Sequence, residues 1–209
     1  MKQSTFNQFA WGILALSVVL PFIAWGSNLS WNFDALQPLT LFGLFGLLAW
    51  MTMWTHYVYG AVRITNPNLK KPKYYGRLTA WFVLGAILLH PGILAVELWQ
   101  NGAGFPPSSF TDYVGASLQL AVIFGSIALT LFLSFEVFDR IKTKAWVQKY
   151  WKAISISQSL AMILIFVHGL RLGSVIDSGW FYWVWIAYGA ALIPCFYIIH
   201  KADFTEKQS

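Results

Sequence analysis

Two histidines lie inside apolar stretches of this chain. His90 lies within residues 76–99, and His168 lies within the similar stretch 151–173. An ionisable side chain inside an apolar segment long enough to cross a membrane is costly, and it marks a functional site by default. Two neutral imidazoles on neighbouring helices are the axial ligands that a six-coordinate haem iron requires. The pattern therefore predicts that His90 and His168 bind the iron of one b-type haem.

The expected depths of the two histidines agree with this interpretation. At about 1.5 Å of rise per residue, His90 lies about 20 Å along its helix from Arg77, and His168 lies about 24 Å from Lys152. Taken singly, each histidine also fits a buried polar residue that bonds to a neighbouring helix. Small residues beside both would let a flat macrocycle approach the backbone: Gly85, Ala86, Gly92, Ala161 and Gly169.

The elements that must position these histidines are membrane spans. The chain has 209 residues, of which 57% are apolar and 11% are charged, a composition foreign to a soluble domain of this size. Apolar segments of about 20 residues cross the ~30 Å hydrocarbon layer of a bilayer as helices. The first segment has some features of a signal peptide, but we interpret it as a helix. The sequence thus predicts an all-α protein, a single transmembrane domain over residues 1–209 with a bundle of six helices at residues 9–25, 39–62, 76–99, 113–138, 151–172 and 180–200.

The positive net charge of +6 predicts the orientation of this bundle. Six spans put both termini on one side, and thirteen of the 14 Lys and Arg residues then fall on that side, with Arg171 alone on the other. By the positive-inside rule, both termini are expected to be cytoplasmic. The basic residues are thus expected to orient the protein and to contact membrane lipid, and no nucleic-acid partner is predicted.

The remaining polar residues offer weaker candidates. Arg171 is one helical turn from His168, and it is the candidate partner of a haem propionate. His56 and His200 lie near the cytoplasmic ends of their spans. They form either a second, inner ligand pair or, in the interpretation we favour, interfacial residues near an aromatic belt. Cys195 is the one cysteine, so no disulfide or Cys-based metal motif exists, and we expect a packing role.

These motifs are also similar to those of a known family. A Gly-Arg pair precedes the apolar run to His90, and Trp151 precedes the run to His168 and Gly173. Over residues 40–173 the arrangement resembles the ferric reductase-like transmembrane domain superfamily. That superfamily includes NADPH oxidases, metalloreductases and the haem-binding membrane subunit of the bacterial periplasmic methionine sulfoxide reductase system. The resemblance implies a six-helix bundle in a bacterial inner membrane, with b haems between the third and fifth helices, that passes electrons from the cytoplasmic side to an acceptor outside.

The chain departs from the family pattern at the inner side of the membrane. The positions 13 residues before His90 and His168, where the family commonly has a second histidine pair, hold Arg77 and Ser155. We therefore expect one haem, in the outer half of the membrane. No GxGxxG motif and no room for a flavin or nicotinamide domain exist in the chain. If the protein is a transmembrane oxidoreductase, its donor is separate, either a quinol or a soluble reductase, and its acceptor is outside, such as a periplasmic protein.

A second class of function stays open at this point. A six-helix relative that has lost its haem would serve as an assembly partner, a channel or a transporter. The missing inner ligands favour this alternative, and the outer histidine pair opposes it. A transporter would more often have interrupted helices at matched positions, of which only Pro91 and Pro194 give a hint.

Overall fold

The chain is helical in the computed structural model, which describes residues 1–34, 36–177 and 179–205, with side chains described as far as Lys201. No strand occurs among these residues. Six helices are long and apolar enough to cross a membrane, the fourth being α5 together with the η1 turn. These helices mark an integral membrane protein and confirm the expected all-α chain with six membrane-length helices. The elements are α1 (Gln3–Asn28), α2 (Pro38–Thr65), α3 (Tyr75–Gln100), α4 (Ser108–Tyr113), η1 (Ala116–Leu118), α5 (Gln119–Arg140), α6 (Ala145–Leu172) and α7 (Trp180–Thr205).

Long uninterrupted helices are the expected form of these apolar segments. In hydrocarbon no water is present to bond the backbone, so each span must satisfy its own N–H and C=O groups. Pro38 opens α2, at the position where a missing N–H costs nothing. The helices α3 and α7 continue through Pro91 and Pro194. The structure therefore does not show the matched helix interruptions that would have favoured a transporter.

Several helix boundaries differ from the predicted spans: α1, for example, begins at Gln3 and not at residue 9. The fourth span is predicted from residue 113, but the backbone at Val114 and Gly115 is extended, with ψ of 153° and 156°, and it separates α4 from η1. The fifth span is predicted from residue 151, yet α6 begins at Ala145. Ala145, Gln148 and Lys149 are good helix formers. The segment before residue 151 therefore extends the helix instead of forming a loop.

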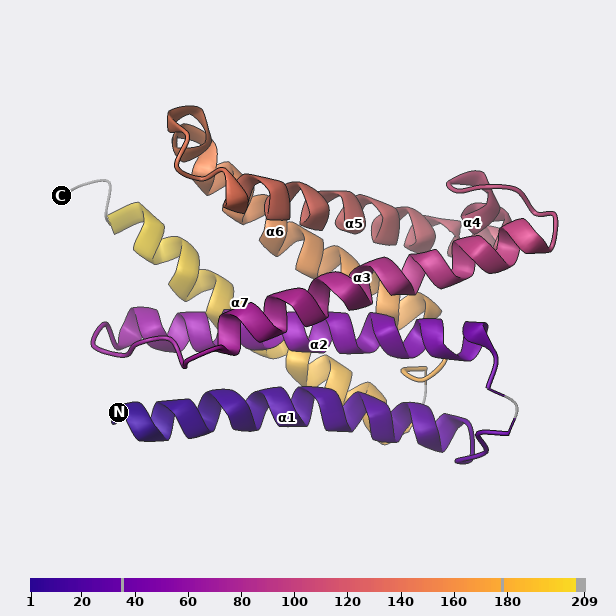
Figure 1. The fold of residues 1–209 in the computed structure, drawn as a ribbon, viewed down its shortest axis with the longest axis horizontal. Helices are drawn as coiled ribbons and strands as arrows, with labels where there is room; N and C mark the ends of the chain where they lie inside the picture. The colour runs from indigo at the N-terminus through magenta and orange to yellow at the C-terminus, as the bar shows by residue number, and fades with distance from the viewer. Residues whose placement is uncertain (35, 178, 206–209) are drawn as a thin grey trace.

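The bundle is built around two helical hairpins. One hairpin pairs α2 with α3, and the other pairs α5 with α6. Figure 1 shows α1, α2 and α3 lying side by side, with α7 crossing obliquely behind α2, and contacts join α2 to both α1 and α7. The hairpins are thus two similar units, and α7 contacts α2 of the first and α6 of the second.

A buried aromatic cluster ties α2 to α6 and α7. The ring of Trp50 lies 4.2 Å from that of Trp185 and 5.8 Å from that of Phe166, measured between centroids. The indole N–H of Trp50 donates to the carbonyl oxygen of Met162 at 3.1 Å, and the indole N–H of Trp185 donates to that of Phe166 at 3.3 Å. A buried indole N–H needs an acceptor. These bonds therefore fix the positions of α2 and α7 along the axis of α6 as well as their distances from it.

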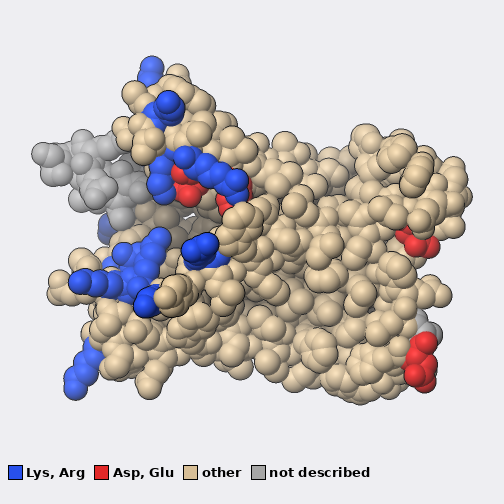
Figure 2. Space-filling model, viewed as in Figure 1, with Lys and Arg blue, Asp and Glu red and all other residues tan. Residues whose placement is uncertain are grey.

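The two ends of the bundle differ in charge. Figure 2 shows that Lys and Arg gather at one end of the molecule, whereas the opposite end shows acidic side chains. The basic end contains the start of α1, the α2–α3 and α5–α6 connections and the end of α7. We call the opposite end the acidic end. This separation is the three-dimensional form of the charge asymmetry in the sequence.

Candidate functional site: paired histidines between two hairpins

His90 is fixed by the neighbouring helix of its own hairpin. It lies in the second half of α3, and its Nδ1 atom is 2.6 Å from the carbonyl oxygen of Phe42, near the start of α2. Its imidazole also stacks on the ring of Phe42, with centroids 5.2 Å apart and planes inclined by 15°. A carbonyl oxygen can only accept, so Nδ1 must carry the hydrogen. In a neutral imidazole this leaves the lone pair on Nε2.

His168 is held in the same way in the second hairpin. It lies near the end of α6, and its Nδ1 atom donates to the carbonyl oxygen of Ala121, near the start of α5, at 2.8 Å. The lone pair of the neutral ring is again on Nε2. Histidines that bind metals usually donate their other ring N–H to a carbonyl or carboxylate, which fixes the tautomer and the ring orientation. Both histidines thus have the bonding pattern of a metal ligand.

A glycine lies under each imidazole ring. A Cβ atom built on Gly46 of α2 would lie 2.9 Å from both Nδ1 and Cε1 of His90. A Cβ atom built on Gly125 of α5 would lie 2.6 Å from Nδ1 and 2.7 Å from Cε1 of His168. Each histidine ring therefore occupies space that any other residue at the glycine position would fill.

The structure brings the two predicted ligands together. The ring centroids of His90 and His168 are 6.2 Å apart, and the ring planes are inclined by 87°. Two metal–nitrogen bonds of about 2 Å each, with each ring centre about 1 Å behind its nitrogen, would place two imidazole centroids roughly 6 Å apart on opposite sides of one ion. The donor set and the distance between the ring centroids would therefore allow His90 and His168 to hold a single iron between them.

Three of the small residues that the sequence singled out have surroundings different from those of the histidine rings. A Cβ atom on Gly85 or Gly92 would meet no atom within 4 Å beyond its own helix, whereas Gly169 packs against Trp185 of α7, not against the site. Sequence reasoning missed Gly46 and Gly125. Their signal is a repeated Phe-Gly pair at nearly equal distance from the ligand: Gly46 precedes His90 by 44 residues, and Gly125 precedes His168 by 43.

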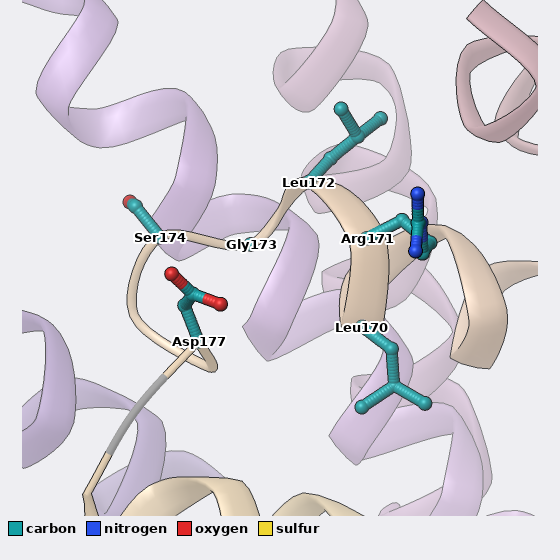
Figure 3. A pocket seen from close by; sticks show the side chains of 6 residues that line it. All are labelled: Leu170, Arg171, Leu172, Gly173, Ser174 and Asp177. Atoms are coloured by element: carbon teal, nitrogen blue, oxygen red, sulfur yellow. The ribbon is translucent and has the colours of Figure 1, made fainter. Parts of the chain in front are cut away.

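Arg171 lies at the end of α6 and is exposed. It lines a small cavity of about 120 Å³ with Gly173, Ser174 and Asp177. Figure 3 shows the side chains of Arg171 and Asp177 pointing to opposite sides of the turn that ends the helix. Its position one turn beyond His168 is compatible with a propionate partner, and that role stays a prediction.

The two other histidines face different helices near the basic end. The Nε2 atom of His56 lies 2.6 Å from Oγ1 of Thr79 on α3. The Nε2 atom of His200 lies 3.0 Å from Oγ of Ser159 on α6. Each of these two Nε2 atoms is thus bonded to a hydroxyl group of a neighbouring helix, as expected of polar residues in a bundle. This arrangement favours the interpretation that the two residues are structural.

A cavity of about 420 Å³ separates the two hairpins at the basic end. Residues of α3, from Gly76 to Ile87, form one wall, and Phe132, Leu133 and Glu136 of α5 form another. Polar groups also line it: His56, Tyr57, Lys71, Asp139, Ser155 and Gln158. The cavity begins at the α2–α3 connection and reaches Ile87, three residues before His90. It therefore leads from the basic end toward His90 along α3.

Comparisons with known proteins leave these residues as the main guide to function. No protein-family model matches the chain, and neither curated proteins nor solved structures give a match. Within the described part of the chain, no group of three or more His, Cys, Asp or Glu side chains could hold a metal ion. The fold and site thus define a six-helix integral membrane protein in which His90 and His168 lie next to one another.

Proposed function

We propose that this protein is a haem b-containing membrane electron-transfer protein with one haem near the acidic end of the bundle. One observation carries the proposal: both Nδ1 atoms of the facing pair, His90 and His168, are committed to backbone carbonyls. This leaves two Nε2 lone pairs for one iron. When bound, the group supplies reversible one-electron reduction of that iron.

The residues of the chain hold and orient the group in this proposal. His90 comes from α3 and His168 from α6, so the ligands tie the two hairpins together across their interface. Arg171, one turn from His168, is the proposed partner of a propionate. The apolar helices around the pair exclude water. The dielectric constant near the site is therefore low, and interactions between charges there are stronger than in water.

The proposed orientation places the basic end in the cytoplasm of a bacterial cell, with the protein in the inner membrane. The positive-inside rule supports it, because the basic residues gather at the end that contains the start of α1 and the end of α7. The histidine pair then lies in the outer half of the membrane. Electrons pass from a donor at the basic end to an acceptor, such as a periplasmic protein, at the acidic end.

The cavity between the hairpins favours a small, lipid-soluble donor such as a quinol over a docked soluble reductase. A protein at the basic end would stay about 20 Å from His90, the rise along α3 from Arg77. A small molecule in the cavity can reach Ile87, about 4.5 Å of helix rise from His90. The apolar walls suit a ring and tail, and the polar side chains of His56 and Gln158 suit hydroxyl or carbonyl groups.

One observation favours a second candidate function, a haem-free channel or transporter. The cavity lies between two similar hairpins, an arrangement that transporters use for their binding sites. In that case His90 and His168 would be polar residues that join helices.

A reduced-minus-oxidised visible spectrum of the purified protein, with haem quantified per chain as the pyridine haemochrome, separates the two functions. Bis-histidine b-type bands at one haem per chain are expected. A protein that stays colourless after expression with added haem would overturn the proposal and turn attention to transport or assembly.

A further inference from the structure

We infer that Gly46 and Gly125 are positioning residues that hold the two histidine rings at right angles to one another. The inference rests on the proposed function, because its consequence is the geometry of the two ligands of a bound iron. It goes beyond that function by assigning a role to two residues that touch neither iron nor substrate. Each acts through the histidine ring that it contacts.

The contacts leave no room for a side chain under either ring. Real Cβ atoms essentially never approach another atom closer than 3.0 Å, and a Cβ atom added at either glycine would do so: at 2.9 Å on Gly46 and at 2.6 Å on Gly125. The ring atoms involved include Nδ1, which is already fixed by its bond to a backbone carbonyl. An alanine at either position must therefore turn the imidazole or lengthen that bond.

Glycine also exposes the carbonyl that each histidine uses. The acceptors, Phe42 and Ala121, each precede a glycine by four residues, which is one turn of the same helix. In a helix, the carbonyl of residue i points toward residue i+4, whose side chain ordinarily shields it. With no side chain at that position, the carbonyl oxygen can accept from the imidazole. The glycine, the carbonyl and the ring thus form one unit, which occurs once in each hairpin.

Other glycines of the same hairpin have no such close contact, so the contact is not a general feature of helix packing in this bundle. A Cβ atom on Gly43, three residues before Gly46, or on Gly85 would meet nothing within 4 Å. Glycine inside a helix costs about 1 kcal/mol relative to alanine. Gly46 and Gly125 differ from these by a contact with a histidine ring.

Two independent units set the angle between the rings. Each ring follows the direction of its own carbonyl and glycine, and together the two units give an angle of 87° between the planes. For a low-spin ferric iron with two axial imidazoles, the relative ring orientation controls the splitting of the d orbitals. Perpendicular planes give a single, strongly anisotropic electron paramagnetic resonance signal, whereas parallel planes give a rhombic spectrum.

The test compares alanine substitutions in the haem-loaded protein. Gly46→Ala and Gly125→Ala are the test variants, and Gly43→Ala and Gly60→Ala, where a Cβ atom would meet nothing within 4 Å, are the matched controls. The wild type and both controls are expected to give the anisotropic signal. The test variants are expected to lose most of it, either to a rhombic signal or through loss of haem at unchanged helical content, judged by far-ultraviolet circular dichroism.

The outcomes separate this inference from the proposed function. A rhombic wild-type signal would overturn the positioning role even if both test variants failed to fold. A test variant that retains the wild-type signal would overturn it too, while leaving the haem assignment intact. A wild-type protein without haem would instead remove the proposed function, and the positioning role with it.

Discussion

The imidazole of His90 is held twice by one residue, Phe42: by a 2.6 Å bond to its carbonyl oxygen and by stacking on its ring. The backbone bond survives any substitution of the side chain, but the stacking does not. His168 has the carbonyl bond, to Ala121, without an aromatic ring from the same residue. The two ligands are therefore equivalent in hydrogen bonding and different in packing.

Substitution of Phe42 separates these two contributions. Phe42→Leu is expected to keep the haem but to weaken its binding by about tenfold, the lower range for loss of an outer contact to a metal ligand. Transfer of haem to an apo-globin acceptor measures the change. Phe45→Leu, on the same helix, is the control, and equal rates for the two variants would contradict a role for the stacking.

The two facing histidines should be required for haem, and the other two should not. His90→Ala or His168→Ala removes one of two axial ligands, so haem per chain is expected to fall to near zero in detergent. His56→Ala and His200→Ala, which lose bonds to hydroxyl groups of neighbouring helices, are expected to retain it. Haemochrome content of each purified variant gives the result. Haem that survives both of the first two substitutions would show that the ligands are elsewhere.

The cavity predicts where a quinol donor should be blocked. Leu84 lines the cavity, whereas Leu88, one turn further along α3, is 50% exposed on the surface of the bundle. Leu84→Phe is expected to slow haem reduction by a short-chain quinol at least tenfold, and Leu88→Phe to leave it unchanged. Stopped-flow absorbance in lipid nanodiscs measures both rates. Reduction by dithionite is the control, since it shows that the haem of each variant can still be reduced. Equal slowing of quinol-driven reduction in both variants would contradict a route through the cavity.

Much of this architecture could be predicted from the sequence, because membrane spans are limited by length and composition. Six apolar segments and two histidines inside them follow from that physics alone. The glycines could not be found in the same way, since their role depends on which helix face meets the ring of His90 or His168. The short helix α4 was missed because Val114 and Gly115 form a break that hydropathy does not register.

The charge asymmetry predicts opposite accessibility of the two ends of the bundle. Lys144 at the basic end and Asn101 at the acidic end are both exposed, and Cys195 is buried. In a Cys195→Ser background, Lys144→Cys is expected to react with a membrane-impermeant thiol reagent only after cells are opened, and Asn101→Cys in intact cells. The reverse pattern would place the basic end outside and invert the proposed direction of electron transfer.

The packing of the aromatic cluster predicts that two glycine-to-alanine substitutions have different effects on the stability of the bundle. A Cβ atom on Gly189 of α7 would lie 2.3 Å from the ring of Phe166, which is itself stacked on Trp185 with planes inclined by 4°. Because that ring has little freedom to move, Gly189→Ala is expected to destabilise the bundle by about 1–3 kcal/mol, the usual cost of overpacking.

Gly60 of α2 is the matched control, since a Cβ atom there would meet nothing within 4 Å. Gly60→Ala is expected to leave the stability unchanged or to raise it by up to about 1 kcal/mol, through the higher helix propensity of alanine. Thermal unfolding in detergent, followed by tryptophan fluorescence, gives the two midpoints. A Gly189→Ala midpoint equal to that of Gly60→Ala would mean that Phe166 can leave its stack at little cost, and that the aromatic cluster does not fix the position of α7 against α6.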